Sequence, residues 1–221
     1  MRSSRSRAWI DGGLIAAASA LFLFPLALHL DGFPFSPGAA YSDALIAHLS
    51  AASFLHRALI VQGQIPLWNP TILGGMPFAA DPLSGLWYPP MWFLAMAPSA
   101  PAINLLFWGH LVFGGIGMYL LLRAEGLGRM ASLAGGLAFA GMPKIIGHVG
   151  LGHLTLVEAV SWSPWLLLAA GRAIEGVGRS HSARAFLVAG ALAGAAFLAD
   201  PRWFVPVALT ALGYGTWRWV V

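Results

Sequence analysis

Apolar runs close to the length of a lipid bilayer recur along most of this chain and limit it to a membrane fold. A helix that crosses a bilayer needs about 20 predominantly apolar residues. Hydrophobic residues make up 58% of the 221 residues and charged residues only 9%, against about 25% charged residues in soluble domains. We therefore predict an all-α, polytopic transmembrane helical bundle of about six spans, at residues 14–30, 103–122, 130–142 with flanks, 154–171, 185–199 and 203–221.

The basic residues predict the orientation of this bundle. With a cytoplasmic amino terminus, nine of the 12 lysine and arginine residues fall on the inner side, as the positive-inside rule requires. Arg57, Lys144 and Arg202 then lie outside, together with four of the aspartates and four of the histidines. Any chemistry is therefore expected on the extracytoplasmic face. No nucleic-acid partner is expected, because the basic residues form no patch interleaved with aromatic residues.

A long first extracytoplasmic loop, residues 31–100, separates the first two expected spans. Residues 42–62 contain no proline or glycine, and apolar residues recur there at three- and four-residue steps, at Leu45, Leu49, Ala52, Leu55 and Leu59. This spacing predicts an amphipathic helix that lies in the membrane interface. Residues 66–90 hold six prolines and two tryptophans, which predicts an ordered segment that folds against the bundle and the interface. A second short interfacial helix is expected at 87–96.

Asp43, at the start of the amphipathic stretch, is the first candidate for chemistry. Its carboxylate could act as a general base or help to hold a divalent cation, and the alternative is that it caps the helix. His148 and His153 are expected in a loop between the third and fourth spans, hydrogen-bonded to a substrate or to another loop. Their spacing does not fit a helical zinc pair, so no metal site is predicted there. Lys144 could neutralise a phosphate or anchor the chain at the interface.

Three further acids have competing interpretations. Glu158 is expected about one turn inside a span, where an ionisable group suggests function unless it reaches water. Asp200 and Arg202 are close enough in sequence to pair with each other. Asp81 precedes Pro82 and most simply starts a turn. The sequence contains neither a phosphate-binding P-loop nor a dinucleotide fingerprint, and no cysteine for a thiol nucleophile.

Several motifs resemble those of one family of membrane proteins. The stretch PLWNPTILGGMPFAADPLSGLWYPP, preceded by YSDALIAH and followed by GHVGLGHLTLVEAVSWSPWLLLA, resembles the bacterial YfhO-like proteins, which are similar to the GT-C superfamily of glycosyltransferases. The resemblance implies a GT-C-like fold with its site on the extracytoplasmic face of the bacterial inner (plasma) membrane. It places Asp43 at the catalytic acid of the first loop and the histidine-containing segment in the second loop of the site. YfhO-like proteins are longer, so we expect residues 1–221 to form a single transmembrane module of a longer protein. Its parts would be residues 1–30, 31–100 and 101–221.

The function implied by the resemblance is glycosyl transfer. The donor would be a polyprenyl-phosphate-linked sugar, the acceptor a cell-envelope polymer or glycolipid, and the cofactor, if any, a divalent cation such as Mg²⁺ or Mn²⁺. A lipid or glycan transporter (flippase) and a non-catalytic membrane scaffold are the alternatives. Asp43 is the candidate catalytic residue, and the candidate substrate-binding residues are Arg57, Trp68, Asn69, Asp81, Tyr88, Lys144, His148, His153, Glu158 and Arg202.

Overall fold

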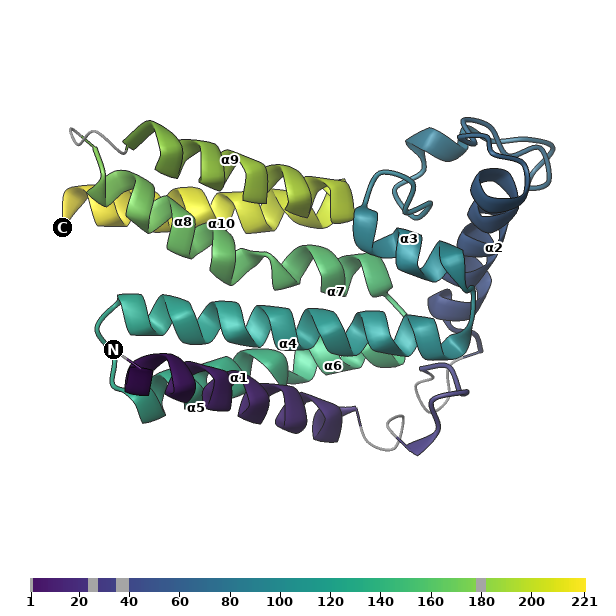
Figure 1. Cartoon of the computed structure of the whole chain (residues 1–221). Coiled ribbons are helices and arrows are strands. Elements are labelled where there is room, and N and C mark those ends of the chain that lie inside the picture. Colours follow the sequence, from purple (N-terminus) through teal and green to yellow (C-terminus); the bar gives the residue numbers. More distant parts are fainter. Residues whose placement is uncertain (1, 24–27, 35–39, 178–181) are drawn as a thin grey trace.

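A computed structural model describes residues 2–23, 28–34, 40–177 and 182–221, and within these ranges the chain is helical with no β-strand longer than a single bridge. The long helices lie alongside one another, and both termini lie at the same end of this bundle (Figure 1). The α-helices are α1 (Arg2–Phe22), α2 (Ser50–His56), α3 (Pro89–Met96), α4 (Ala100–Ala124), α5 (Arg129–Ala140), α6 (Pro143–Gly150), α7 (Leu154–Ser161), α8 (Ser163–Glu175), α9 (Ser182–Ala199) and α10 (Pro201–Val220).

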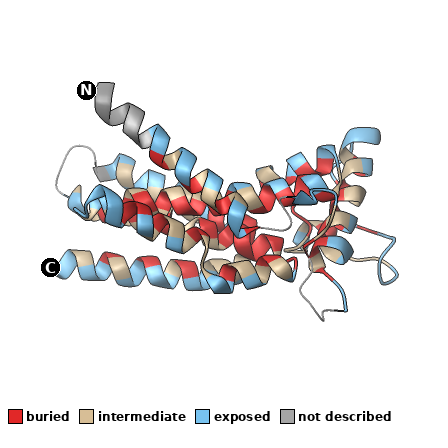
Figure 2. Ribbon diagram, turned by 90° about the horizontal axis from the view of Figure 1, so that it is seen from below, coloured by how far each residue is buried: buried red, intermediate tan, exposed pale blue. Residues whose placement is uncertain are grey.

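Four helical stretches in the described part of the chain are long and apolar enough to cross a membrane: Ala44–Val61, Ala100–Ala124, Arg129–Gly150 and Leu154–Glu175. The apolar part of α1 and the apolar part of α9 are shorter than these four stretches. Buried residues gather where the helices face one another, and exposed residues cover the outside of the bundle (Figure 2). The architecture thus confirms a multi-pass, all-helical membrane protein.

Prolines set several of the helix boundaries. Helices α3, α4, α6, α8 and α10 each carry proline in the first turn, where its missing N–H group costs nothing. Pro164 accordingly divides the expected fourth span into α7 and α8. The first span was placed wrongly: its helix runs from Arg2 to Phe22 instead of over residues 14–30. Pro25 follows closely, and a helix usually ends before the residue that precedes proline.

The helix expected in the first outer loop is present and lies across one end of the bundle (Figure 1). It comprises the π-helical turns η2 (Ala44–Leu49) and η3 (Arg57–Val61) with α2 between them. Its buried face differs from the predicted stripe, because Leu45 is exposed while Ala44 and His48 are buried. A π-helical turn holds more residues than an α-helical turn and so rotates the buried face by about one residue.

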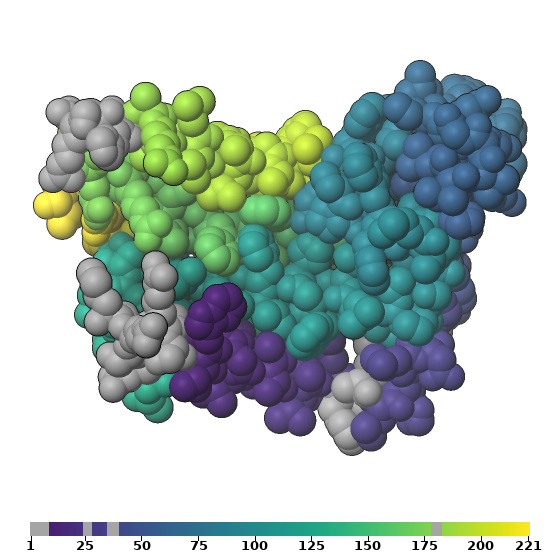
Figure 3. Space-filling model, viewed as in Figure 1, coloured from purple at the N-terminus to yellow at the C-terminus, as the bar shows by residue number. Residues whose placement is uncertain are grey.

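Residues 66–90 form an ordered lobe over the α2 helix (Figure 3). Phe78, in the 3₁₀ turn η4 (Phe78–Ala80), packs in a small core with Leu55 and Leu86, and its ring meets Phe54 edge-on at 4.9 Å. The Trp87 indole N–H donates to the Ala79 carbonyl oxygen at 2.8 Å. The short helix α3 follows this segment, as predicted.

The tip of the lobe is a tight turn in which Leu73 and Gly74 both have positive φ, 54° and 76°. The Gly75 N–H donates to the Ile72 carbonyl oxygen at 2.8 Å, which closes the turn. Leucine is disfavoured in this conformation, and its side chain is 92% exposed. Replacing Leu73 with asparagine is expected to stabilise the protein by about 1 kcal/mol, because Asn-Gly suits such turns. Thermal unfolding in detergent micelles would measure this; an unchanged or lower midpoint would contradict it.

Ion pairs hold the opposite end of the bundle together. Asp11 of α1 accepts from Arg129 at 2.6 Å and from the Tyr119 hydroxyl at 2.8 Å. Arg218, near the carboxyl terminus, pairs with Glu125 at 3.3 Å and also with Glu175. All three acids expected on the cytoplasmic side are therefore neutralised by arginines from other helices.

Candidate functional site

Asp43 lies at the junction between the long segment 31–100 and the bundle. It directly precedes the Ala44–Val61 helix, but its side chain makes no capping hydrogen bond. Its Oδ2 atom instead lies 3.4 Å from Nε2 of His153, and both side chains are one-third exposed. The interpretation of Asp43 as a helix cap is therefore wrong, and its carboxylate faces another segment.

A close backbone contact holds these two segments together. The Asp43 N–H donates to the Leu151 carbonyl oxygen at 3.1 Å. Gly152, which follows Leu151, has φ +79°. A Cβ atom at Gly152 would lie 2.4 Å from both the Ala44 nitrogen and the Ser42 Oγ. Only glycine allows this approach.

His148 and His153 are in contact through their rings. Their Nδ1 atoms are 2.8 Å apart, and the edge of the Trp203 indole lies against His148 at a centroid distance of 6.0 Å. The expectation that both lie in a loop was wrong for His148, which is part of α6, whereas His153 directly precedes α7. Pro143 can begin a helix, and the following residues continue it to the turn at Gly152. Lys144, in the first turn of α6, is exposed.

Asp200 and Arg202 form the predicted pair beside these residues. The guanidinium donates to both Asp200 oxygens, at 2.7 and 3.0 Å, and the Thr155 hydroxyl donates to Asp200 Oδ2 at 2.8 Å. Burial alone would raise the pKa of the Asp200 carboxyl, but the hydrogen bonds from Arg202 and Thr155 outweigh it and hold this pKa below its ordinary value. Arg202 is also close enough to Asp43 and Asp81 for both carboxylates to favour its charged form.

Acid is expected to destabilise the protein through Asp200. Because its pKa is lower in the folded state, the ionised carboxylate contributes stability above about pH 4, and this contribution is lost as the pH falls through the folded-state pKa. The Asp200→Asn protein should lack the loss of folding stability at acid pH that comes from the Asp200 carboxylate. Unfolding midpoints in micelles at several pH values would test this, and two parallel curves would contradict it.

A second polar group lies deeper in the bundle, around the Tyr88 hydroxyl. The Trp162 indole N–H donates to Tyr88 at 2.9 Å, and the Tyr88 oxygen is 2.8 Å from Nε2 of His110. Nδ1 of His110 lies 2.8 Å from the Leu106 carbonyl oxygen, which can only accept, so Nδ1 carries the hydrogen and Nε2 accepts from Tyr88. Burial raises the pKa of Tyr88, which keeps this hydroxyl protonated.

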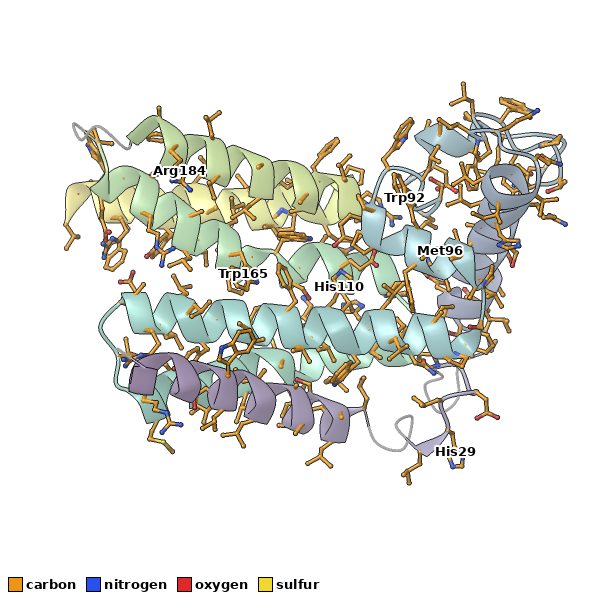
Figure 4. The ribbon with its side chains drawn as sticks, in the orientation of Figure 1. His29, Trp92, Met96, His110, Trp165 and Arg184 are labelled. Carbon is orange, nitrogen blue, oxygen red and sulfur yellow. The ribbon has the colours of Figure 1, made fainter. Side chains whose placement is uncertain are left out.

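This group forms the polar part of an apolar groove of about 270 Å³. His110 points from α4 toward the space beside α7 (Figure 4). The groove is lined by Tyr88, Pro90, Leu105, Leu106, Gly109, His110, Phe113 and Trp162.

Glu158 lies behind this groove, one helical turn before Trp162. It is fully buried, and neither carboxyl oxygen has a hydrogen-bond partner. The interpretation that Glu158 reaches water was wrong, because α7 packs against α4, α6, α9 and α10, and the Glu158 side chain is fully buried. An ionisable group buried in this way needs a functional explanation.

The remaining predicted residues contact their own segments, and of these Asp81 acts on the first group only through its charge, on Arg202. Asn69 accepts from the Thr71 backbone and hydroxyl, and Asp81 accepts from the Leu83 N–H at 2.9 Å, so both stabilise turns. The turn interpretation of Asp81 is confirmed. Trp68 covers Gly75 in the lobe, and Arg57 is exposed on the outer helix.

Sequence reasoning did not select His48, His110, Thr155 or Trp162 for the site. His48 is 1% exposed, with Nδ1 unpartnered, and its electrostatic coupling to His153 places it near the first group. A polar residue on the buried face of an otherwise apolar helix was the available signal for both His48 and His110. In the described part of the chain, His, Asp and Glu side chains form no group of three that could hold a metal ion.

Comparison with known proteins adds no relative: no family model, curated protein or solved structure matches this chain.

Proposed function

We propose that this chain is a membrane glycosyltransferase of the GT-C type, which moves a sugar from a polyprenyl-phosphate carrier to an envelope polymer or glycolipid. The resemblance of its motifs to YfhO-like proteins suggests the reaction. One observation carries the proposal: Asp43 of the first outer loop lies 3.4 Å from His153 of the second. The two segments that this reaction requires therefore meet at one end of the bundle.

The proposed topology has six spans, with the amino terminus in the cytoplasm of a bacterial cell. The spans are α1, α4, α5 with α6, α7 with α8, α9 and α10, which lie alongside one another in Figure 1. The Ala44–Val61 helix, though long and apolar enough to cross a membrane, lies across the end of this bundle and is assigned to the interface.

The chemistry follows from the groups at that end. Asp43 takes the proton of the acceptor hydroxyl, whose oxygen then attacks the sugar carbon bonded to the carrier phosphate. Arg202 and Lys144, both exposed at the same end, balance the charge of the departing phosphate. The apolar groove beside Tyr88 accommodates part of the lipid, and the ordered lobe limits access of water. Among the residues that the structure describes, no further carboxylate joins Asp43 in a group of ligands, so this donor set does not fit a protein-held Mg²⁺ or Mn²⁺ ion.

A transfer assay tests this proposal. Membrane vesicles that contain the protein are supplied with a polyprenyl-phosphate sugar labelled in the sugar, and the label is expected to move into a polymer or glycolipid. Vesicles without the protein are the control. Label that remains on the carrier throughout would contradict glycosyl transfer.

A transporter is the second candidate, and Glu158 is the observation that favours it. A fully buried carboxyl group without a partner is typical of ion and substrate paths through membranes. This function predicts that the labelled carrier crosses the bilayer without forming a new glycosidic bond.

A further inference from the structure

His153 contacts both Asp43 and His148. When the His153 ring carries one extra proton, it can donate a hydrogen bond to each of them. Its Nε2 faces Oδ2 of Asp43 at 3.4 Å, and its Nδ1 faces Nδ1 of His148 at 2.8 Å. We propose that His153 is the acceptor of the proton that Asp43 removes from the hydroxyl, and that His148 holds the His153 ring ready for it. This inference rests on the proposed glycosyl transfer.

The protonation states follow from the geometry. Two ring nitrogens 2.8 Å apart must share one hydrogen, so one of the two Nδ1 atoms donates and the other accepts. If His153 donates there, its Nε2 is free to take a proton from Asp43. The imidazolium that results has one N–H toward the carboxylate and the other toward His148. No other arrangement with His153 protonated satisfies both neighbours.

The neighbouring basic groups oppose an imidazolium at His153, so a carboxylate in contact with it must balance its charge. His148, Lys144 and His48 are the basic groups nearest the pair on α6 and on the outer helix, and each discourages a second positive charge. Arg202 is on the α10 side, where Asp200 binds its guanidinium. Asp43 is thus the carboxylate that directly contacts His153, and it is the one available to balance the imidazolium.

The bonds balance over one turnover. The acceptor O–H bond breaks and its proton passes to Asp43, the oxygen forms a bond to the sugar carbon, and the carbon–oxygen bond to phosphate breaks with its electron pair leaving on the phosphate. The Asp43 carboxyl proton then passes to Nε2 of His153, which restores the carboxylate. The proton finally leaves to water, since the His153 side chain is one-third exposed. His153 and His148 act through Asp43 and are positioning residues.

Activity and chemical rescue form the first arm of the test. His153→Gln keeps a polar side chain but cannot accept the proton, and we expect transfer to fall about 10²-fold, the lower end of what acid–base catalysis contributes. In His153→Ala, added imidazole should restore part of the rate, whereas in Asp43→Asn it should not. His29→Gln is the matched control, because His29 is exposed and belongs to a segment before the Ala44–Val61 helix. Full activity of His153→Gln, or no rescue of a folded His153→Ala protein, would overturn the inference.

Nitrogen-15 NMR of labelled histidines forms the second arm and needs no activity. A coupling between the two Nδ1 atoms across the hydrogen bond is expected in the wild type and should vanish in His148→Gln. Asp43→Asn should move the Nε2 resonance of His153, because the group that faces this nitrogen at 3.4 Å changes from a carboxylate to an amide. If these signals behave as expected but no sugar is transferred, the proposed function fails while the proton pair stands. An absent coupling, or a His153 signal unaffected by Asp43→Asn, would overturn the pair itself.

Discussion

Asp43→Asn is expected to lower sugar transfer by about 10²–10⁴-fold, the contribution of a positioned general base. The amide has nearly the shape of the carboxylate but cannot take the hydroxyl proton. The substitution also removes the negative charge that faces His153 at 3.4 Å. The rate of label transfer in vesicles, at saturating donor, would measure the effect.

Asp31→Asn is the matched control for this substitution. Asp31 is also an aspartate that precedes the Ala44–Val61 helix, and its side chain is exposed. It should retain the wild-type rate. Equal losses in both variants would point to a general effect of outer charge, and full activity of a folded Asp43→Asn protein would exclude Asp43 as the base.

Gly152→Ala is expected to destabilise the protein by about 2–5 kcal/mol and to abolish transfer. One part of this cost is the left-handed backbone at φ +79°, and the larger part is overlap of the new methyl group with the Ala44 nitrogen and the Ser42 hydroxyl. Because backbone atoms are among the obstacles, the two outer segments must separate, which moves Asp43 away from His153. Thermal unfolding and transfer rate would be measured on the same preparation.

Alanine substitutions at two other glycines separate the cost of the left-handed backbone from the cost of the methyl overlap. Gly63 also has a positive φ, +65°, but a Cβ atom there meets nothing, so Gly63→Ala should cost only about 1 kcal/mol. Gly147 lies in α6 with open space and ordinary helical geometry, so Gly147→Ala should be neutral or stabilising by up to about 1 kcal/mol. If Gly152→Ala behaves like Gly63→Ala, the close contact does not position the site.

The positions of most helices could be predicted from the sequence, because long apolar runs, and prolines at their starts, act locally. The outer amphipathic helix and α3 were found in this way. The first helix and the buried face of the outer helix were misplaced. The start of α1 is rich in serine and arginine, so hydropathy does not reveal it, and the π-helical turns at Ala44–Leu49 alter a spacing that the sequence suggests is α-helical.

The individual site residues were easier to predict than their contacts. Asp43, His153 and Arg202 could be assigned to one end of the bundle by counting charges. The pairing of Asp43 with His153 depends on Gly152, whose close approach to another segment is not visible in a single sequence. The burial of Glu158 was missed for the same reason, since helices such as α4 and α10 that pack against α7 are far away from it in the chain.

The hydrogen bond between Trp162 and Tyr88 joins residues 74 positions apart, and this separation imposes an order on biosynthesis. At about 5–20 residues per second, the ribosome makes Trp162 roughly 4–15 s after Tyr88. During this interval the lobe has emerged without its anchor, and its tryptophan and leucine side chains are open to chaperones and proteases. Changes that delay insertion of α7 should therefore reduce the amount of protein in the membrane while the molecules that do mature keep their normal properties.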